Sequence, residues 1–145
     1  MRRRPGPWWW PVRITFGLFF LHTALAKREL DEKGAKGLHR FASAAYPQLK
    51  RVEPATFVRG MTIAESTIAA SLLVPVVPAT VGAAGLTAFG VGLVGTYARV
   101  PGLRREGSVR PTEIGLSLAK DTWMVAAGSA ALIDAWLSPP RARAS

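Results

Sequence analysis

The chain has 145 residues, no cysteine and a formal net charge of +10. This length indicates one domain, and the lack of cysteine excludes disulfides, thiolate metal sites and cysteine nucleophiles. A nucleic-acid-binding protein would carry its Lys and Arg along one folded surface. Here all except Arg13 and Lys120 fall in four blocks, at 2–4, 27–59, 99–110 and 141–143, separated by long apolar stretches. This alternation of basic blocks and apolar stretches disfavours nucleic-acid binding and is typical of membrane spans joined by basic loops.

Residues 9–26 are predicted to form the first membrane span. Three consecutive tryptophans precede its apolar body, "ITFGLFFLHTALA", and indole rings favour the headgroup level. Arg13 lies one turn inside, and we expect its side chain to reach back to the headgroups. The alternative is a secretory signal cleaved after Ala26, because a basic start followed by an apolar run and small residues imitates one. Arg13 and the preceding tryptophans argue against cleavage.

The stretch from Ser66 to Ala98 carries no charged residue. As one straight helix it would run about 50 Å, well beyond the roughly 30 Å hydrocarbon core of a bilayer. Two prolines in its first half also obstruct a continuous helix. The sequence therefore predicts a helical hairpin of two spans, 58–77 and 80–99. This hairpin places Glu65 inside the second span.

The fourth span is predicted over 114–137, although Lys120 and Asp121 stand side by side in its first third. A span that began at Thr122 would avoid both charges but would be slightly short of crossing a bilayer upright. The expected fold class is therefore all-α: an integral membrane four-helix bundle, in one membrane domain over 1–145.

The loop between the first two spans, 27–57, is long and rich in charge. It also has apolar residues at roughly helical spacing. We expect a short amphipathic helix at the membrane interface, broken by Gly34 and Gly37 and ended by Pro47.

With four spans, both large loops lie on the same side of the membrane, and the helix ends beside them form a polar mouth. A lone charge inside a membrane costs about 2.5–3.5 kcal/mol, so we expect the buried charges to pair. Glu65 and Lys120 lie at matching depth, about 10 Å inside, and are predicted partners; Arg59 or Arg99 would then pair with Asp121. The charged residues expected at this mouth are Lys27, Arg59, Glu65, Arg99, Lys120 and Asp121.

Two interpretations of this mouth stay open. In the first, the Glu65–Lys120 pair fixes helix register and has no other role. In the second, the polar pocket binds a headgroup or relays protons, since ionisable residues inside membranes are often functional. The candidate pocket also includes His22, just over a turn from the loop end of the first span. A haem or metal site there is disfavoured because no other span contains a histidine, and we expect His22 to be buried and hydrogen-bonded.

Three segments resemble the DoxX-like family, a group of small four-helix bacterial membrane proteins. "ITFGLFFLHTALAKRELDEKGAKGLHRFA" is similar to the first span of the family and the helical segment after it. "MTIAESTIAASLLV" is similar to the second span, and Glu65 matches its acidic residue. "LAKDTWMVAAGSAALI" is similar to the start of the last span, where Lys120 and Asp121 match. Together these segments extend from Ile14 to Ile133.

The chain departs from the family pattern in two places. Ala69, Ala70 and Ser71 stand where the second span usually carries glycines, and the N-terminus, rich in Trp and Arg, is its own. The resemblance implies a multi-pass protein of the plasma (inner) membrane. It also implies association with membrane redox complexes, or with quinone-linked oxidation of sulfur compounds, commonly beside a protein partner.

The expected function is an auxiliary subunit of a membrane redox or envelope complex, without independent catalytic activity. Its partners would be the lipid bilayer, a membrane or peripheral protein and, in a homo-oligomer, further copies of the chain. The alternative is a quinone-linked oxidoreductase component in which Glu65, Lys120 and Asp121 surround the quinone headgroup. A transporter acting as an oligomer is weaker, because four spans show no inverted repeat. The termini are expected in the cytoplasm.

Overall fold

The computed structural model describes residues 6–137, and helices are the regular elements of that range. An isolated β-bridge between Arg104 and Pro111 is the one departure within it. The predicted all-α class is therefore confirmed. The elements are α1 (Trp9–Arg28), α2 (Glu32–Ala45), the 3-10 helix η1 (Pro47–Arg51), α3 (Pro54–Leu73), α4 (Ala79–Arg99), α5 (Leu116–Ala119) and α6 (Thr122–Leu137).

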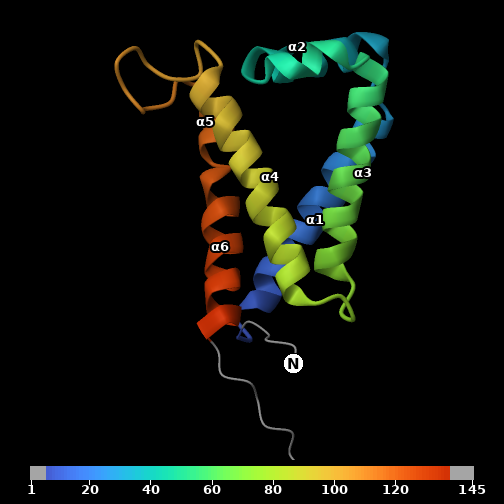
Figure 1. Cartoon of the computed structure of the whole chain (residues 1–145), viewed down its shortest axis with the longest axis vertical. Helices are drawn as coiled ribbons and strands as arrows, with labels where there is room; N and C mark the ends of the chain where they lie inside the picture. Colours follow the sequence, from blue (N-terminus) through green and yellow to red (C-terminus); the bar gives the residue numbers. More distant parts are fainter. Residues whose placement is uncertain (1–5, 138–145) are drawn as a thin grey trace, which may run out of the picture.

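The long helices form two antiparallel pairs (Figure 1). α1 packs along α3, and α4 packs along α6, whereas α3 and α4 touch less extensively. The pairs lie close together near the start of α1 and diverge toward the other end, where α2 lies across the helix ends. We call this second end the mouth.

α2 is one continuous helix, so the predicted break at its glycines is wrong. The carboxylate of Asp31 caps it by accepting a hydrogen bond of 2.7 Å from the Gly34 amide. Such a cap stabilises a helix by about 1 kcal/mol, comparable with the cost of one glycine inside it. The helix ends at Ala45, just before Pro47, because proline disfavours helical geometry in the residue preceding it.

Tyr46 fastens the end of α2 to α4. Its hydroxyl donates a hydrogen bond of 2.7 Å to the Gly92 carbonyl oxygen. The guanidinium of Arg99 lies 5.1 Å from the centre of the same ring, within range of a cation–π contact. Gly95 makes room for this arrangement, since a Cβ at that position would collide with the Tyr46 hydroxyl.

α3 and α4 are joined by a turn, but α3 lies four residues nearer the N-terminus at both ends than the predicted span 58–77. It ends at Leu73, and α4 begins at Ala79. Val74 is extended, with φ −80° and ψ 115°, because the proline after it disfavours helical geometry there.

The prediction of a single helix over 114–137 is wrong. α6 has only 16 residues, and Lys120 and Asp121 separate it from α5. At this break the Asp121 amide donates to the Leu118 carbonyl, and the Met124 amide donates to the Asp121 carbonyl, each over 3.0 Å. Both bonds join residues three apart, which is the tighter 3-10 pattern.

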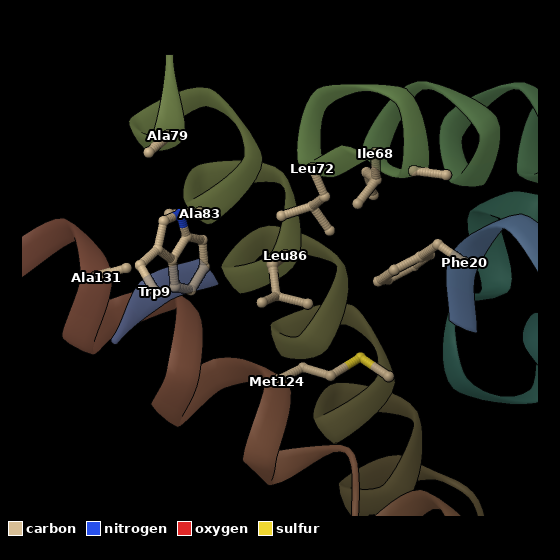
Figure 2. Packing of buried hydrophobic residues seen from close by; sticks show 10 residues of the cluster. Trp9, Phe20, Ile68, Leu72, Ala79, Ala83, Leu86, Met124 and Ala131 are labelled. Carbon is tan, nitrogen blue, oxygen red and sulfur yellow. The ribbon is translucent and has the colours of Figure 1, made fainter. Parts of the chain in front are cut away.

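The hydrophobic core lies toward the end away from the mouth. Figure 2 shows Leu86 of α4 at its centre, between Leu72 of α3 and Met124 of α6. The rings of Phe20 and Phe89 meet edge to face, with centroids 5.0 Å apart, and connect α1 to α4. The buried members of the cluster are Trp9, Phe20, Ile68, Ala69, Leu72, Ala79, Ala83, Leu86, Met124 and Ala131.

Candidate functional site

A buried ion pair joins α1 to α3. The Nζ atom of Lys27 lies 2.8 Å from Oε1 of Glu65. Glu65 is only 3% exposed, and the side chain of Lys27 is 17% exposed. The other carboxylate oxygen of Glu65, Oε2, is buried and has no hydrogen-bond partner within the described residues. The carboxylate can therefore accept one more hydrogen bond.

The sequence of α3 directs Glu65 inward. Val58, Glu65 and Leu72 are seven residues apart and are all buried, so the acid lies on the same face as the apolar residues that pack on α1. Lys27 lies in the last turn of α1, where the helix dipole favours a cation.

The predicted pairing of Glu65 with Lys120 is wrong. Lys120 is exposed at the junction of α5 and α6, and Lys27 takes the place assigned to it. The reason is topological: α3 packs along α1, not along α6. Asp121 is half-buried at the same junction and forms no ion pair within the described range.

Arg59 and Arg99 do not pair with Asp121 either, so that prediction is also wrong. Arg99 is exposed and lies over the ring of Tyr46. Arg59 is exposed on α3, at the mouth. Arg99 instead contacts a residue at the end of α2, and Arg59 lines the groove at the mouth.

His22 is exposed on α1, so the expectation of a buried, hydrogen-bonded histidine is wrong. It shares its helix face with Leu18 and Leu25, which are also exposed. Helical spacing of 18, 22 and 25 places the three side chains together, on the side opposite the α1–α3 contact.

An open groove of about 700 Å³ lies at the mouth, between the end of α1, the start of α2 and α3. Lys27 lines it and also holds Glu65, so the groove adjoins the buried ion pair. Its lining contains charges of both signs. The cations are Lys27, Arg28, Lys36 and Arg59, and the acids are Asp31, Glu32 and Glu53.

The end away from the mouth has a second buried charge whose role sequence analysis missed. Arg13 is 4% exposed and does not reach the headgroup level as predicted. Its Nε donates to the carbonyl of Leu72 over 2.6 Å, and its Nη2 donates over 2.9 Å to those of Ser71 and Val74. The last carbonyls of a helix lack partners within it and attract cations. Arg13 of α1 thus caps the end of α3.

Asp134 makes a similar connection between α6 and the segment just before α1. Its Oδ2 accepts hydrogen bonds from the Gly6 amide, over 2.6 Å, and from Nε1 of Trp8, over 3.2 Å. A lone acid near the end of an apolar segment was the only sequence feature that could have identified it. Its partners lie more than 120 residues away, so only the tertiary structure reveals the contact.

The residues predicted to surround a quinone headgroup are not brought together. Glu65 lies between α1 and α3, while Lys120 and Asp121 lie at the α5–α6 junction. The mouth groove includes Arg59 but neither Glu65, Lys120, Asp121 nor His22. The predicted quinone site therefore does not fit this arrangement. The described residues also contain no cluster of three His, Asp or Glu side chains that could hold a metal ion.

The polar contacts at both ends of the α1–α3 pair therefore connect helices. Comparisons of this chain with protein-family models, with curated proteins and with solved structures find no match.

Proposed function

We propose that this chain is a multi-pass protein of the plasma (inner) membrane that serves as an auxiliary subunit of a membrane redox or envelope complex. The observation that carries the proposal is the apolar character of the outward faces of its long helices. The resemblance to the DoxX-like family, which stays a prediction, favours the same role.

The outward face of α1 illustrates this character. Ile14, Leu18, Leu21 and Leu25 recur every three or four residues and are all exposed. A protein in water rarely leaves so continuous an apolar stripe uncovered, and such a stripe indicates a membrane or a protein partner. Further large apolar side chains are exposed on the other long helices, at Ile63, Val81, Val91, Trp123, Ile133 and Trp136.

α4 is long and apolar enough to cross a membrane, and it is the one helix of the described range that meets both conditions. Only 33% of its most apolar stretch is buried inside the protein. The core helix of a soluble protein would be mostly buried, so the exposure of α4 favours contact with lipid.

Exposed tryptophans at one end of the molecule fit one membrane interface. Trp8, Trp10 and Trp136 are exposed at the end away from the mouth. Trp123, exposed at the start of α6, lies only about 20 Å from Trp136 along the helix, less than the roughly 30 Å hydrocarbon core, and does not mark the second interface. Indole rings concentrate at the headgroup levels of membranes.

The charges inside the α1–α3 pair are turned away from the proposed lipid. Arg13 binds backbone carbonyls, and Lys27 binds Glu65. Pairing of this kind reduces the cost of placing charge in a membrane, so these residues do not oppose the proposal.

The auxiliary role is supported by open sites for a partner helix. A Cβ added at Gly60 of α3 or at Gly92 of α4 would meet no atom within 4 Å. Small residues on a membrane helix allow another helix to approach closely. These positions can therefore receive a helix of a partner subunit or of a second copy.

Cysteine labelling in native membrane vesicles tests the membrane assignment, since the chain contains no cysteine of its own. We expect Leu18→Cys to resist a charged, water-borne maleimide in opened vesicles and to react with it after the protein is unfolded in SDS, because a thiol in lipid does not ionise. Glu106→Cys, in the exposed loop after α4, should react with the water-borne reagent once the vesicles are opened. Equal water-borne labelling of both positions would show that the apolar face is not in lipid.

Purification in mild detergent after chemical crosslinking tests the auxiliary role. We expect a partner protein at fixed stoichiometry and a weaker yield of it from Gly60→Leu or Gly92→Leu. The matched variant Gly37→Leu changes an exposed glycine of α2 that also has open space around it, and it should retain the partner. Recovery of the chain alone in every preparation would refute the role.

The quinone-linked alternative loses Lys120 and Asp121, which lie at the α5–α6 junction, away from Glu65. Its one supporting observation is the unsatisfied Oε2 of Glu65. The alternative predicts that Glu65→Gln weakens quinone binding, and unchanged binding would refute it. The transporter hypothesis gains no support from the arrangement of the helices.

A further inference from the structure

Another open groove, of about 500 Å³, lies where α2, η1 and the start of α3 meet. Its polar lining comes from Lys36, His39, Arg40, Ser43 and Lys50, and no carboxylate contributes to it. It differs in this respect from the larger mouth groove, whose lining mixes both signs of charge. We call it the basic groove.

The cations of the basic groove retain positive charge for a ligand. Arg40 and Lys50 are exposed, and neither forms an ion pair within the described part of the chain. Lys36 binds Glu32, one turn earlier on α2, and this hydrogen bond lowers the pKa of the Glu32 carboxyl. Two of the three cations therefore form no ion pair there, although Arg40 also lines an adjoining hollow that contains Asp31 and Glu32.

Tertiary contacts hold the floor of the groove in place. Nε2 of His39 lies 2.8 Å from the Leu49 carbonyl oxygen and donates to it. The imidazole also meets the ring of Phe57 edge to face, at 5.5 Å. These contacts tie α2 to η1 and to α3, so Arg40 and Lys50 are presented from fixed backbones. A preorganised site loses less entropy when a ligand binds.

Ser43 adds a hydroxyl to this floor. It is 4% exposed, and its Oγ lies 3.4 Å from Nε2 of His39. Because that nitrogen donates its proton to Leu49, the Ser43 hydroxyl keeps its own proton for another acceptor. The groove thus offers a neutral donor beside its cations.

We propose that the basic groove binds the phosphate of a phosphate ester. Phosphate oxygens accept hydrogen bonds from guanidinium groups, ammonium groups and hydroxyls. Lys36 and Arg40 lie one turn apart on α2, so both side chains can contact the same small group. This spacing favours a phosphate over an extended acidic peptide. The ester is either a phospholipid headgroup or a soluble phosphorylated molecule.

The lipid source rests on the proposed membrane location, whereas the groove itself does not. α2 lies across the ends of the long helices (Figure 1), the level at which headgroups would lie if those helices cross a bilayer. A phospholipid beside α3 could then place its phosphate in the groove while its acyl chains follow the apolar helix faces.

The test uses the full chain in an uncharged maltoside detergent. Binding of glycerol 1-phosphate and of short-chain phosphatidylglycerol is followed by phosphorus NMR line broadening, with short-chain phosphatidylcholine for comparison. Binding of oligoglutamate, which contains no phosphorus, is followed by the fluorescence anisotropy of a dye attached to the peptide. The groove variant is Arg40→Gln with Lys50→Gln. The control is Lys33→Gln with Arg51→Gln, which removes the same charge from exposed residues that do not line the groove.

We expect the groove variant to bind the phosphate probes at least tenfold more weakly, since one hydrogen bond from a charged group accounts for about that factor. The control should stay within about twofold of the wild type. Binding of glycerol 1-phosphate would identify a soluble ester as a sufficient ligand, and binding of phosphatidylglycerol alone would identify the lipid.

Three results would overturn the proposal: no binding of either phosphate probe, equal weakening in the control, or groove-dependent binding of oligoglutamate alone. Thermal unfolding of both variants shows whether they remain folded. The titration is done in detergent, with a soluble probe among the ligands. A negative result would therefore refute the groove proposal without testing the membrane assignment, which the labelling experiment tests separately.

Discussion

The two helix pairs are held together by different physical means. In the α1–α3 pair, buried charges connect the helices: Arg13 caps α3 at one end, and Lys27 binds Glu65 near the other. In the α4–α6 pair, close packing dominates. A Cβ at Gly128 would lie 2.8 Å from the Ala83 carbonyl oxygen, which is closer than side chains can approach a backbone.

This difference predicts which kind of substitution each helix pair tolerates. The α1–α3 pair also contains a glycine contact, at Gly17, but there the atoms closer than 3.0 Å belong to the side chain of Leu73, and the next is Cβ of Leu72 at 3.3 Å. At Gly128 the obstructing atoms include the backbone of α4, which cannot move without displacing the helix. Charge removal should therefore damage the first pair, and added volume should damage the second.

The largest effect is expected for Arg13→Met, because it leaves the buried carbonyls at the end of α3 without their donor. The free energy of unfolding in detergent should fall by about 3–5 kcal/mol. Arg105→Met, in the exposed loop after α4, is the control and should change it by less than about 0.5 kcal/mol. Equal stability of the two variants would contradict the capping role.

Lys27→Met should lower the free energy of unfolding by about 3 kcal/mol, because the buried Glu65 carboxylate loses its counter-ion. The double variant Lys27→Met with Glu65→Leu should recover most of that loss, since no charge then stays buried. A double-mutant cycle measured by unfolding gives the coupling. Additive losses would show that the pair does not interact.

Two glycine substitutions should change the free energy of unfolding in opposite directions. Gly128→Ala should destabilise the α4–α6 pair by about 1–3 kcal/mol through overpacking. Gly92→Ala, in α4 but facing open space, should stabilise the protein by up to about 1 kcal/mol through better helix propensity. The unfolding of the two variants is measured side by side. Equal changes in their free energy of unfolding would show that the packed and the open faces of these helices do not differ.

The smallest effect is expected at the mouth. Tyr46→Phe removes the hydroxyl that binds Gly92 but keeps the ring beneath Arg99. One lost hydrogen bond costs about 0.5–1.5 kcal/mol, so amide hydrogen exchange should become faster in α2 and stay unchanged in α6. Exchange that rises equally in both helices would indicate a general loss of stability.

The helical class and the position of most helices could be predicted from the sequence. Apolar stretches with few charges, together with prolines, located α1, α3 and α4 within a few residues. The continuous helix through Gly34 and Gly37 was missed because a cap and packing outweigh two unfavourable residues. The break at Lys120 could not be predicted from the length of the apolar segment, because a membrane span favours a longer helix.

The candidate site was predicted only in part. Glu65 was expected to be buried and paired, and the structure confirms both. The predicted partner of Glu65 was wrong. The depth of a residue along its helix can be counted from the sequence, but the sequence does not show which helix lies beside it. The same limit explains why the contacts of Arg13 and Asp134 were missed.

The sequence by itself determined that the chain is helical, where its apolar segments lie and which charges fall within them, since these follow from local composition and periodicity. The tertiary structure alone decided which helices are paired, and with them the partners of Glu65 and Arg13 and the meeting of Arg40 with Lys50 in one groove. The physical reason is that an ion pair or a cap acts over a few ångströms, and the choice among equally deep helices depends on how all the side chains pack.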